Sequence, residues 1–199
     1  MNRIGIIILA AGASTRLGEP KQNLLFRGKS LLHHALAVAK VTNCSPILII
    51  TGAHTFENDD LSDSGIYVVQ NPDWQKGIAS SINLGVLYLQ EKEPNISGTI
   101  LMVCDQPYVT STLLHELIAE KMKTNKPIIA CSYQDTLGTP VLFDKQYFGV
   151  LCTLKGDEGA KKIIFKNLED VASISFALGS IDIDTRNDYE QLLASINLE

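Results

Sequence analysis

The chain has 199 residues, of which 45% are hydrophobic and 20% are charged, a composition typical of a globular protein and not of a disordered one. Its net charge of −5 gives no basic surface for nucleic acid, and no apolar run reaches the ~18 residues of a membrane-spanning helix. The length favours a single domain over residues 1–199. The four cysteines form no Cys-x-x-Cys pair, which predicts reduced thiols in a cytoplasmic protein rather than zinc or disulfides.

Short, β-branched apolar runs alternate with helical patterns through the first two thirds of the chain. The runs predict buried strands at 4–9, 47–50, 66–69, 100–103 and 128–131. Apolar residues at helical spacing predict helices after a cap at Ser30, from Ile78, and after a cap at Thr110 or Ser111. This alternation favours parallel strands with right-handed crossovers. We therefore expect a three-layer α/β/α sandwich with a mostly parallel, Rossmann-like sheet.

The alternation loosens in the last third of the chain. The pattern there predicts further strands at 140–143, 174–176 and 181–183, and helices at 159–165 and 189–196. In open α/β sheets, ligands bind at the carboxyl ends of the strands. The residues that directly follow each apolar run are therefore the first candidates for a functional site.

The loop after the first strand combines small residues with two cations. Small residues let backbone N–H groups approach a ligand closely, and the cations can reach the same phosphates. A triphosphate needs this combination, although a tight turn with surface charges would look the same. The loop is neither a P-loop nor a Gly-x-Gly-x-x-Gly dinucleotide loop. The residues concerned are Leu9, Ala10, Ala11, Gly12, Ser14, Arg16 and Lys21.

Carboxylates in two places suit a magnesium ion, which prefers oxygen ligands. Asp105 follows the run at 100–103 and is expected to point into the same crevice as the first loop. It would otherwise cap the next helix, a role that Thr110 or Ser111 can fill. Asp182 and Asp184 lie two apart on the strand expected at 181–183, so both would face one side. An ordinary half-exposed strand would show the same alternation.

The first loop resembles the signature Leu-Ala-Ala-Gly-x-Ser-x-Arg-Met-Gly-x-x-Lys of nucleotidyltransferases in the molybdenum cofactor branch, with Leu17 in place of Met. Further segments resemble this family at 71–81, 104–107, 138–143, 154–160 and 182–188. The resemblance implies the nucleotidyltransferase fold and a Mg²⁺ ion on Asp105. It also implies a second metal ligand from a late strand, either Asp182 or Asp184.

The resemblance implies a role for each of the remaining motif residues. Arg16, Lys21 and Asp105 would be catalytic. The nucleotide would contact the first loop together with Asn71, Gly77, Ser80 and Ser81, although capping and packing alone would also explain Trp74 and the two serines. The acceptor would contact Gln106, Gly138, Thr139, Pro140 and Asp157. Because Thr139 replaces the usual His of the family, the identity of the acceptor stays open.

The resemblance also implies a reaction. The enzyme would transfer CMP from CTP to the phosphate of the molybdopterin-bound molybdenum cofactor and release pyrophosphate, with a molybdenum hydroxylase as a possible recipient of the product. The family's cytidylyl group reads Leu-Ala-Ala-Gly, as here, and the methyl of Ala11 would crowd a purine. The alternatives are a guanylyltransferase, a sugar-phosphate or alditol-phosphate nucleotidyltransferase, and a non-catalytic carrier of the molybdenum cofactor.

Overall fold

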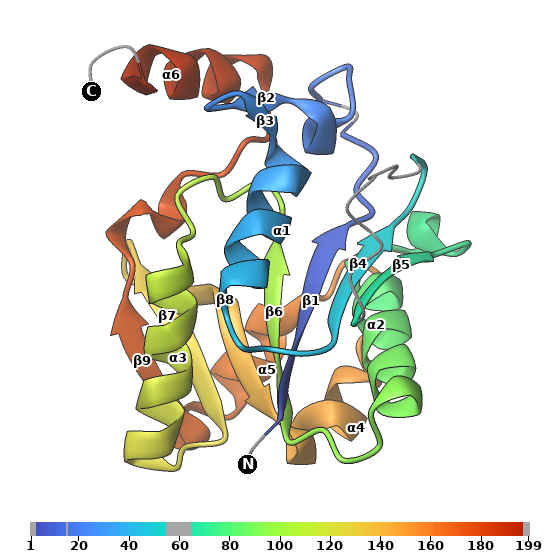
Figure 1. Cartoon of the computed structure of the whole chain (residues 1–199), viewed down its shortest axis with the longest axis vertical. Coiled ribbons are helices and arrows are strands. Elements are labelled where there is room, and N and C mark those ends of the chain that lie inside the picture. The colour runs from blue at the N-terminus through green and yellow to red at the C-terminus, as the bar shows by residue number, and fades with distance from the viewer. Residues whose placement is uncertain (1–2, 15, 55–64, 197–199) are drawn as a thin grey trace.

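A computed structural model describes residues 3–14, 16–54 and 65–196. In these residues, seven strands form one sheet in the order β5-β4-β1-β6-β8-β7-β9, and helices cover both faces (Figure 1). The strands are β1 (Ile4–Ala10), β4 (Ile47–Thr51), β5 (Ile66–Gln70), β6 (Gly98–Val103), β7 (Ile128–Tyr133), β8 (Thr136–Asp144) and β9 (Val171–Ser175). The helices are α1 (Leu31–Val41), α2 (Ile78–Lys92), α3 (Ser111–Thr124), α4 (Phe148–Leu151), α5 (Ala160–Lys166) and α6 (Arg186–Ile196). The expected three-layer α/β/α sandwich is confirmed.

The core has two layers, one on each side of the sheet. Ile6 and Ile8 of β1 pack with α1 and α3, whereas Ile7 and Leu9 pack with α2, α4 and α5. All four side chains are buried. Burial on both faces explains why β1 is a continuous apolar run rather than an alternating one. β5 differs from the expectation of two covered faces, because it lies at the edge of the sheet and its side chains are only partly buried.

The helix starts follow local capping signals. Ser30 caps α1 by accepting a hydrogen bond from the His33 N–H, and Thr110 caps α3 by accepting one from the Leu113 N–H. Thr110 therefore fills the capping role, which leaves Asp105 available for another function.

β8 runs antiparallel to both β6 and β7, and the other strands all share one direction. Gln134 and Asp135 link β7 to β8, and both have positive φ, as the tightest hairpin turns require. This hairpin places the start of β8 at the same end of the sheet as the carboxyl ends of β1 and β6. The strand predicted at 140–143 is thus the second half of a longer one.

The strand predicted at 181–183 is wrong. The segment is irregular and follows a 3₁₀ turn, Ala177–Ser180, and its Ile183 N–H donates to the Asp105 carbonyl at 3.1 Å. The Ile183 side chain is fully buried in a third apolar cluster with Leu17 and Leu192. The alternation of Ile and Asp thus arises because Ile183 is buried next to Asp105, and not because the segment is a strand with one exposed face.

The third cluster lies beyond the carboxyl ends of the parallel strands. A short hairpin of β2 (Leu25–Phe26) and β3 (Lys29–Ser30), which the sequence pattern did not predict, packs there against α6 (Figure 1). The tyrosine hydroxyl of Tyr189 accepts from the Leu25 N–H at 3.2 Å and donates to its carbonyl at 3.0 Å. In the part of the chain described, no helix is long and apolar enough to cross a membrane.

Candidate active site

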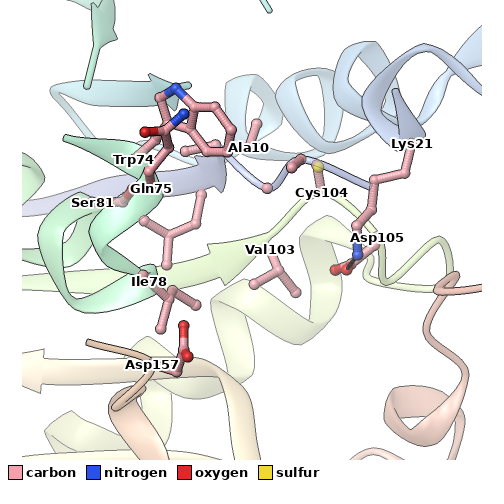
Figure 2. A pocket seen from close by; sticks show the side chains of 15 residues that line it. Ala10, Lys21, Trp74, Gln75, Ile78, Ser81, Val103, Cys104, Asp105 and Asp157 are labelled. Atoms are coloured by element: carbon pink, nitrogen blue, oxygen red, sulfur yellow. Dashed lines mark hydrogen bonds and ion pairs between the residues drawn. The ribbon is translucent and has the colours of Figure 1, made fainter. Parts of the chain in front are cut away.

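A cleft of about 360 Å³ opens where β1 and β6 end (Figure 2). Nine of the residues expected in the site line it: Leu9, Ala10, Ala11, Gly12, Lys21, Gly77, Ser81, Asp105 and Asp157. Residues that the sequence did not assign to the site line it as well: Ala13, Trp74, Gln75, Ile78, Val103 and Cys104. Figure 2 shows Lys21 and Asp105 on one side of the cleft and Trp74, Gln75 and Ser81 on the other.

Lys21 joins two carboxylates from distant parts of the chain. Its Nζ lies 2.5 Å from Asp105 Oδ2 and 2.9 Å from Asp184 Oδ1. Arg16 Nη2 lies 2.9 Å from the other oxygen of Asp184. The Lys21 N–H donates to Ser14 Oγ at 3.0 Å, so Ser14 holds the loop that presents Lys21. Two cations and two carboxylates thus meet where the first loop faces the end of β6.

The charges of this group shift one another's protonation equilibria. Burial lowers the pKa of Lys21, but the carboxylates of Asp105 and Asp184 outweigh it and raise the pKa above its usual range. The hydrogen bond from Lys21 lowers the pKa of Asp184. Burial and the nearby charges of Asp105 and Asp184 raise the pKa of Asp182. Lys21 is therefore an ammonium at neutral pH, held between two carboxylates.

The donor set fits a divalent cation that arrives with phosphates. The described residues contain no group of three His, Cys, Asp or Glu side chains that could hold a metal ion by themselves. Mg²⁺ is usually bound by one or two carboxylates, waters and substrate phosphates, so Asp105 and Asp184 meet its needs. Asp105 Oδ1 is buried and has no hydrogen-bond partner among the described atoms. That free acceptor is the observation that favours a cation here.

A glycine lets the first loop pack closely against the end of β4. A Cβ on Gly52, which directly follows β4, would lie 2.4 Å from the Ala11 carbonyl oxygen and 2.9 Å from Trp74 Cβ. Gly52 therefore lets the loop and Trp74 pack closely. A glycine immediately after a strand was the only sequence signal for this role.

The segment 71–81 divides into supporting and lining residues. Asn71 is buried, and its Nδ2 donates to Ser80 Oγ at 2.8 Å and to Ser81 Oγ at 2.9 Å. Ser80 Oγ donates to the Gly77 carbonyl at 2.8 Å. Gly77 has φ +94°, and a Cβ there would lie 2.3 Å from the Gly156 carbonyl oxygen. Gly77 and Ser81 line the cleft, whereas Asn71 and Ser80 fix the turn behind it.

The residues expected to bind the acceptor fall in two places. Asp157 lines the cleft, close to Gly77, with the residues expected to bind the nucleotide. Gln106, Gly138, Thr139 and Pro140 lie outside its lining, with Gln106 Nε2 donating to the Gly179 carbonyl at 2.8 Å. Gly138 and Thr139 lie near the start of β8, at the end of the sheet where β6 also ends. The structure therefore puts a second group of polar residues beside the cleft.

Known proteins are similar to this chain over most of its length. Nicotine blue oxidoreductase of Paenarthrobacter nicotinovorans is 28% identical, covering 94% of this chain and 95% of that protein. Molybdenum cofactor cytidylyltransferase of Escherichia coli K12 is 24% identical, covering 95% of each. The crystal structure of Rv0371c of Mycobacterium tuberculosis H37Rv in complex with manganese has a TM-score of 0.77 and 28% identity, covering 98% of this chain and 100% of that one. The family model for the MobA-like NTP transferase domain matches residues 6–171. The chain is therefore a nucleotidyltransferase of the MobA-like family.

Proposed function

We propose that this enzyme transfers CMP from CTP to the terminal phosphate of a molybdopterin-type cofactor and releases pyrophosphate. The observation that carries the proposal is the contact of Lys21 with Asp105 and Asp184 beside the first loop, which lines the cleft. Similarity to the E. coli molybdenum cofactor cytidylyltransferase supports the choice of acceptor. The manganese complex of Rv0371c supports a divalent metal, for which we propose Mg²⁺.

In the proposed reaction, an oxygen of the acceptor phosphate attacks the α-phosphorus of CTP in line. The bond from the α-phosphorus to the bridging oxygen of pyrophosphate breaks, and pyrophosphate carries the negative charge away. The N–H groups of the first loop donate to the phosphates, while Arg16 and Lys21 offset the charge on the leaving group. No protein nucleophile is needed, because positioning and electrostatics are sufficient for this type of transfer.

Asp105 and Asp184 would hold the Mg²⁺ ion, with Asp182 close by. When bound, the ion supplies positive charge that stabilises the phosphates in the transition state. The ammonium of Lys21 lies between the same two carboxylates in the structure. We therefore propose that Lys21 exchanges its carboxylate partners for phosphate oxygens when the nucleotide and its metal bind.

The packing of the first loop supports the proposed preference for CTP. Ala11 lines the cleft, and Gly52 packs so closely against the Ala11 carbonyl that the loop has little room to move away from the cleft. The cleft is thereby narrower than one with glycine at position 11. One methyl changes discrimination by about 1–3 kcal/mol, so a purine nucleotide would bind measurably more weakly.

A thermal-shift titration with CTP, GTP and ATP, with and without Mg²⁺, tests the nucleotide. A ligand at 100 times its dissociation constant adds ~2.7 kcal/mol to the stability of the native state. Selective stabilisation by CTP with Mg²⁺ supports the proposal, and stabilisation by GTP would point to a guanylyltransferase. Pyrophosphate release with molybdopterin, compared with sugar phosphates and alditol phosphates, then tests the acceptor. Molybdopterin binding without pyrophosphate release would instead indicate a carrier.

The proposal also covers the domain organisation, the cellular compartment and the recipient of the product. We propose that residues 1–199 act as one domain, supported by the one seven-stranded sheet that the two larger core clusters flank. We also propose a cytoplasmic protein whose product passes to a molybdenum hydroxylase. All four cysteines are unpaired, and Cys44, Cys104 and Cys131 are buried, as suits a reducing compartment.

A further inference from the structure

A tyrosine beside the cleft is fixed between two glycines from different elements. Tyr133 is the last residue of β7, Gly138 lies on the adjacent strand β8, and Gly179 lies in the 3₁₀ turn after β9. A Cβ on Gly138 would lie 2.2 Å from the Tyr133 hydroxyl oxygen. A Cβ on Gly179 would lie 2.6 Å from Cδ1 of the same ring. Neither position tolerates a side chain, so the chain holds this phenol in one place.

Lys161 lies over the face of the same ring. Its Nζ is 5.8 Å from the Tyr133 ring centroid, and its Cε would be 3.1 Å from a Cβ on Gly138. No carboxylate in the described part of the chain pairs with Lys161, whereas the adjacent Lys162 pairs with Glu158. The contact with the ring therefore orients an exposed ammonium that has not been neutralised.

A buried glutamine connects this pair to the catalytic carboxylate. Gln106 directly follows Asp105, and only 6% of its surface is exposed. Its Nε2 donates to the Gly179 carbonyl at 2.8 Å, while its Oε1 has no hydrogen-bond partner among the described atoms. Burial raises the pKa of Tyr133, whereas side-chain hydrogen bonds with Thr139 and Gln106 lower it. Burial is the larger effect, so the phenol is protonated at neutral pH and can donate a hydrogen bond. The group thus offers one cation and one hydroxyl donor.

We propose that Tyr133 and Lys161 bind the phosphate monoester of the acceptor substrate. This inference rests on the proposed nucleotidyl transfer and names the residues that hold its second substrate. A phosphate dianion requires a cation and hydrogen-bond donors, which the ammonium and the phenol supply.

The strand order puts the pair across β6 from the first loop. The nucleotide cleft lies where β1 and β6 end, and Tyr133 lies at the other side of β6, across β8. Asp105 and Gln106 lie between the two. An acceptor phosphate on Tyr133 and Lys161 would approach the α-phosphorus from the side away from the first loop, where the pyrophosphate is held.

The test compares three substitutions by two measurements. Lys161→Gln removes the charge, Tyr133→Phe removes only the hydroxyl, and Lys162→Gln is the control, because Lys162 carries the same charge one residue away but pairs with Glu158. The first measurement is pyrophosphate release at saturating CTP with varied molybdopterin. The second is equilibrium binding of molybdopterin without nucleotide.

We expect Lys161→Gln to raise the KM for molybdopterin and the dissociation constant about tenfold or more, because the site loses a charge-assisted hydrogen bond. Tyr133→Phe should raise both by about fivefold, as expected for a neutral hydrogen bond. The KM for CTP and the melting temperature should change little in either variant. Lys161→Arg should recover most of the affinity.

The two measurements separate this inference from the proposed function. If the wild-type enzyme releases pyrophosphate but Lys161→Gln binds molybdopterin as well as Lys162→Gln does, the acceptor site is elsewhere and the inference fails. If the wild type releases no pyrophosphate but binds molybdopterin through Lys161, the proposed transfer fails and the binding site stands. If the wild type does neither, both are overturned.

Discussion

Lys21 Nζ contacts Asp105 Oδ2 at 2.5 Å and so connects the loop after β1 to the end of β6. The two residues are 84 positions apart in the chain. Because β1 and β6 are adjacent parallel strands, their carboxyl ends bring the two side chains together. The chain therefore keeps a cation and a carboxylate paired at the point where a nucleotide and its metal would bind.

Replacing Lys21 with Met should separate metal binding from catalysis. Without the ammonium, Asp105 and Asp184 face each other without a shared cation, so we expect Mn²⁺ to bind about tenfold more tightly in the absence of nucleotide. Turnover should fall by about 10² or more, because the leaving pyrophosphate loses a cation. Electron paramagnetic resonance titration of Mn²⁺ measures the first effect. Lys123→Met, which breaks only a surface ion pair with Glu120, is the control. Weaker Mn²⁺ binding by Lys21→Met would contradict this account.

Replacing Asp105 with Ala should abolish turnover and leave the fold intact. Lys21 keeps Asp184 as a partner, so the loop retains an ion pair. Circular dichroism and pyrophosphate release measure the two expectations. Asp135→Asn is the control, since Asp135 lies in an exposed turn with positive φ, which Asn also tolerates. Activity above about a tenth of wild type, a barrier change of only ~1.4 kcal/mol, would rule out a catalytic role for Asp105.

The parts of the fold that were predicted from the sequence are those that a local sequence pattern determines. The runs in β1, β4 and β6 are apolar because both faces are buried, and Ser30 and Thr110 mark the helix starts through their own hydrogen bonds. The hairpin between β7 and β8 was not predicted, because Gln134 and Asp135 adopt positive φ without the usual glycine. The direction of β8 depends on that turn.

The site was predicted in outline and not in its contacts. The family resemblance of the first loop, together with the position of Asp105 after a strand, indicated the two halves of the cleft. The contact of Asp184 with Lys21 bridges 163 residues and depends on the irregular segment before α6, whose path the Ile and Asp alternation did not predict. Asp157 reaches the cleft because the loop before α5 packs against the start of α2, where the Ala79 N–H donates to the Gly156 carbonyl at 3.1 Å. These contacts of Asp184 and Asp157 depend on tertiary packing, which a local sequence pattern does not predict.

Replacing Gly77 with Ala should both destabilise the protein and weaken nucleotide binding. Gly77 has φ +94° and ψ 173°, a conformation nearly restricted to glycine. A Cβ there would also lie 2.3 Å from the Gly156 carbonyl oxygen and 2.6 Å from Asp157 Oδ1. We expect a loss of about 2 kcal/mol in the free energy of unfolding, together with a weaker thermal shift from CTP.

Gly149→Ala is the matched control for Gly77→Ala. Gly149 lies within α4, has no heavy atom within 4 Å of a Cβ position, and is outside the cleft. Alanine is favoured over glycine in a helix by about 0.5–1 kcal/mol, so this variant should be slightly more stable than wild type. Urea unfolding measures both variants. Equal stability of the two would contradict the role of Gly77.

The start of α6 should make stability depend on acid pH through Asp188. Asp188 Oδ2 accepts hydrogen bonds from Thr185 Oγ1 and N–H, both at 2.7 Å, and from the Asp184 N–H at 3.2 Å. The Asp188 N–H donates back to Thr185 Oγ1 at 3.3 Å, which completes a reciprocal cap. The hydrogen bond from the Thr185 hydroxyl is the main cause that lowers the pKa of Asp188. The same cap holds the backbone of Asp184, which pairs with Lys21 in the site.

A carboxyl group whose pKa is lower in the folded state than in the unfolded state stabilises the fold above the unfolded value. That contribution is lost as the pH falls from the ordinary value of 3.8 through the lower folded value. Asp188→Asn cannot ionise, so it should melt below wild type at neutral pH, and the difference should shrink below pH 3.8. Thermal melts from pH 6 to pH 3 measure this difference. A constant difference over that range would show that the charge of Asp188 contributes nothing to the cap, and a raised KM for CTP in the same variant would show that the cap positions Asp184.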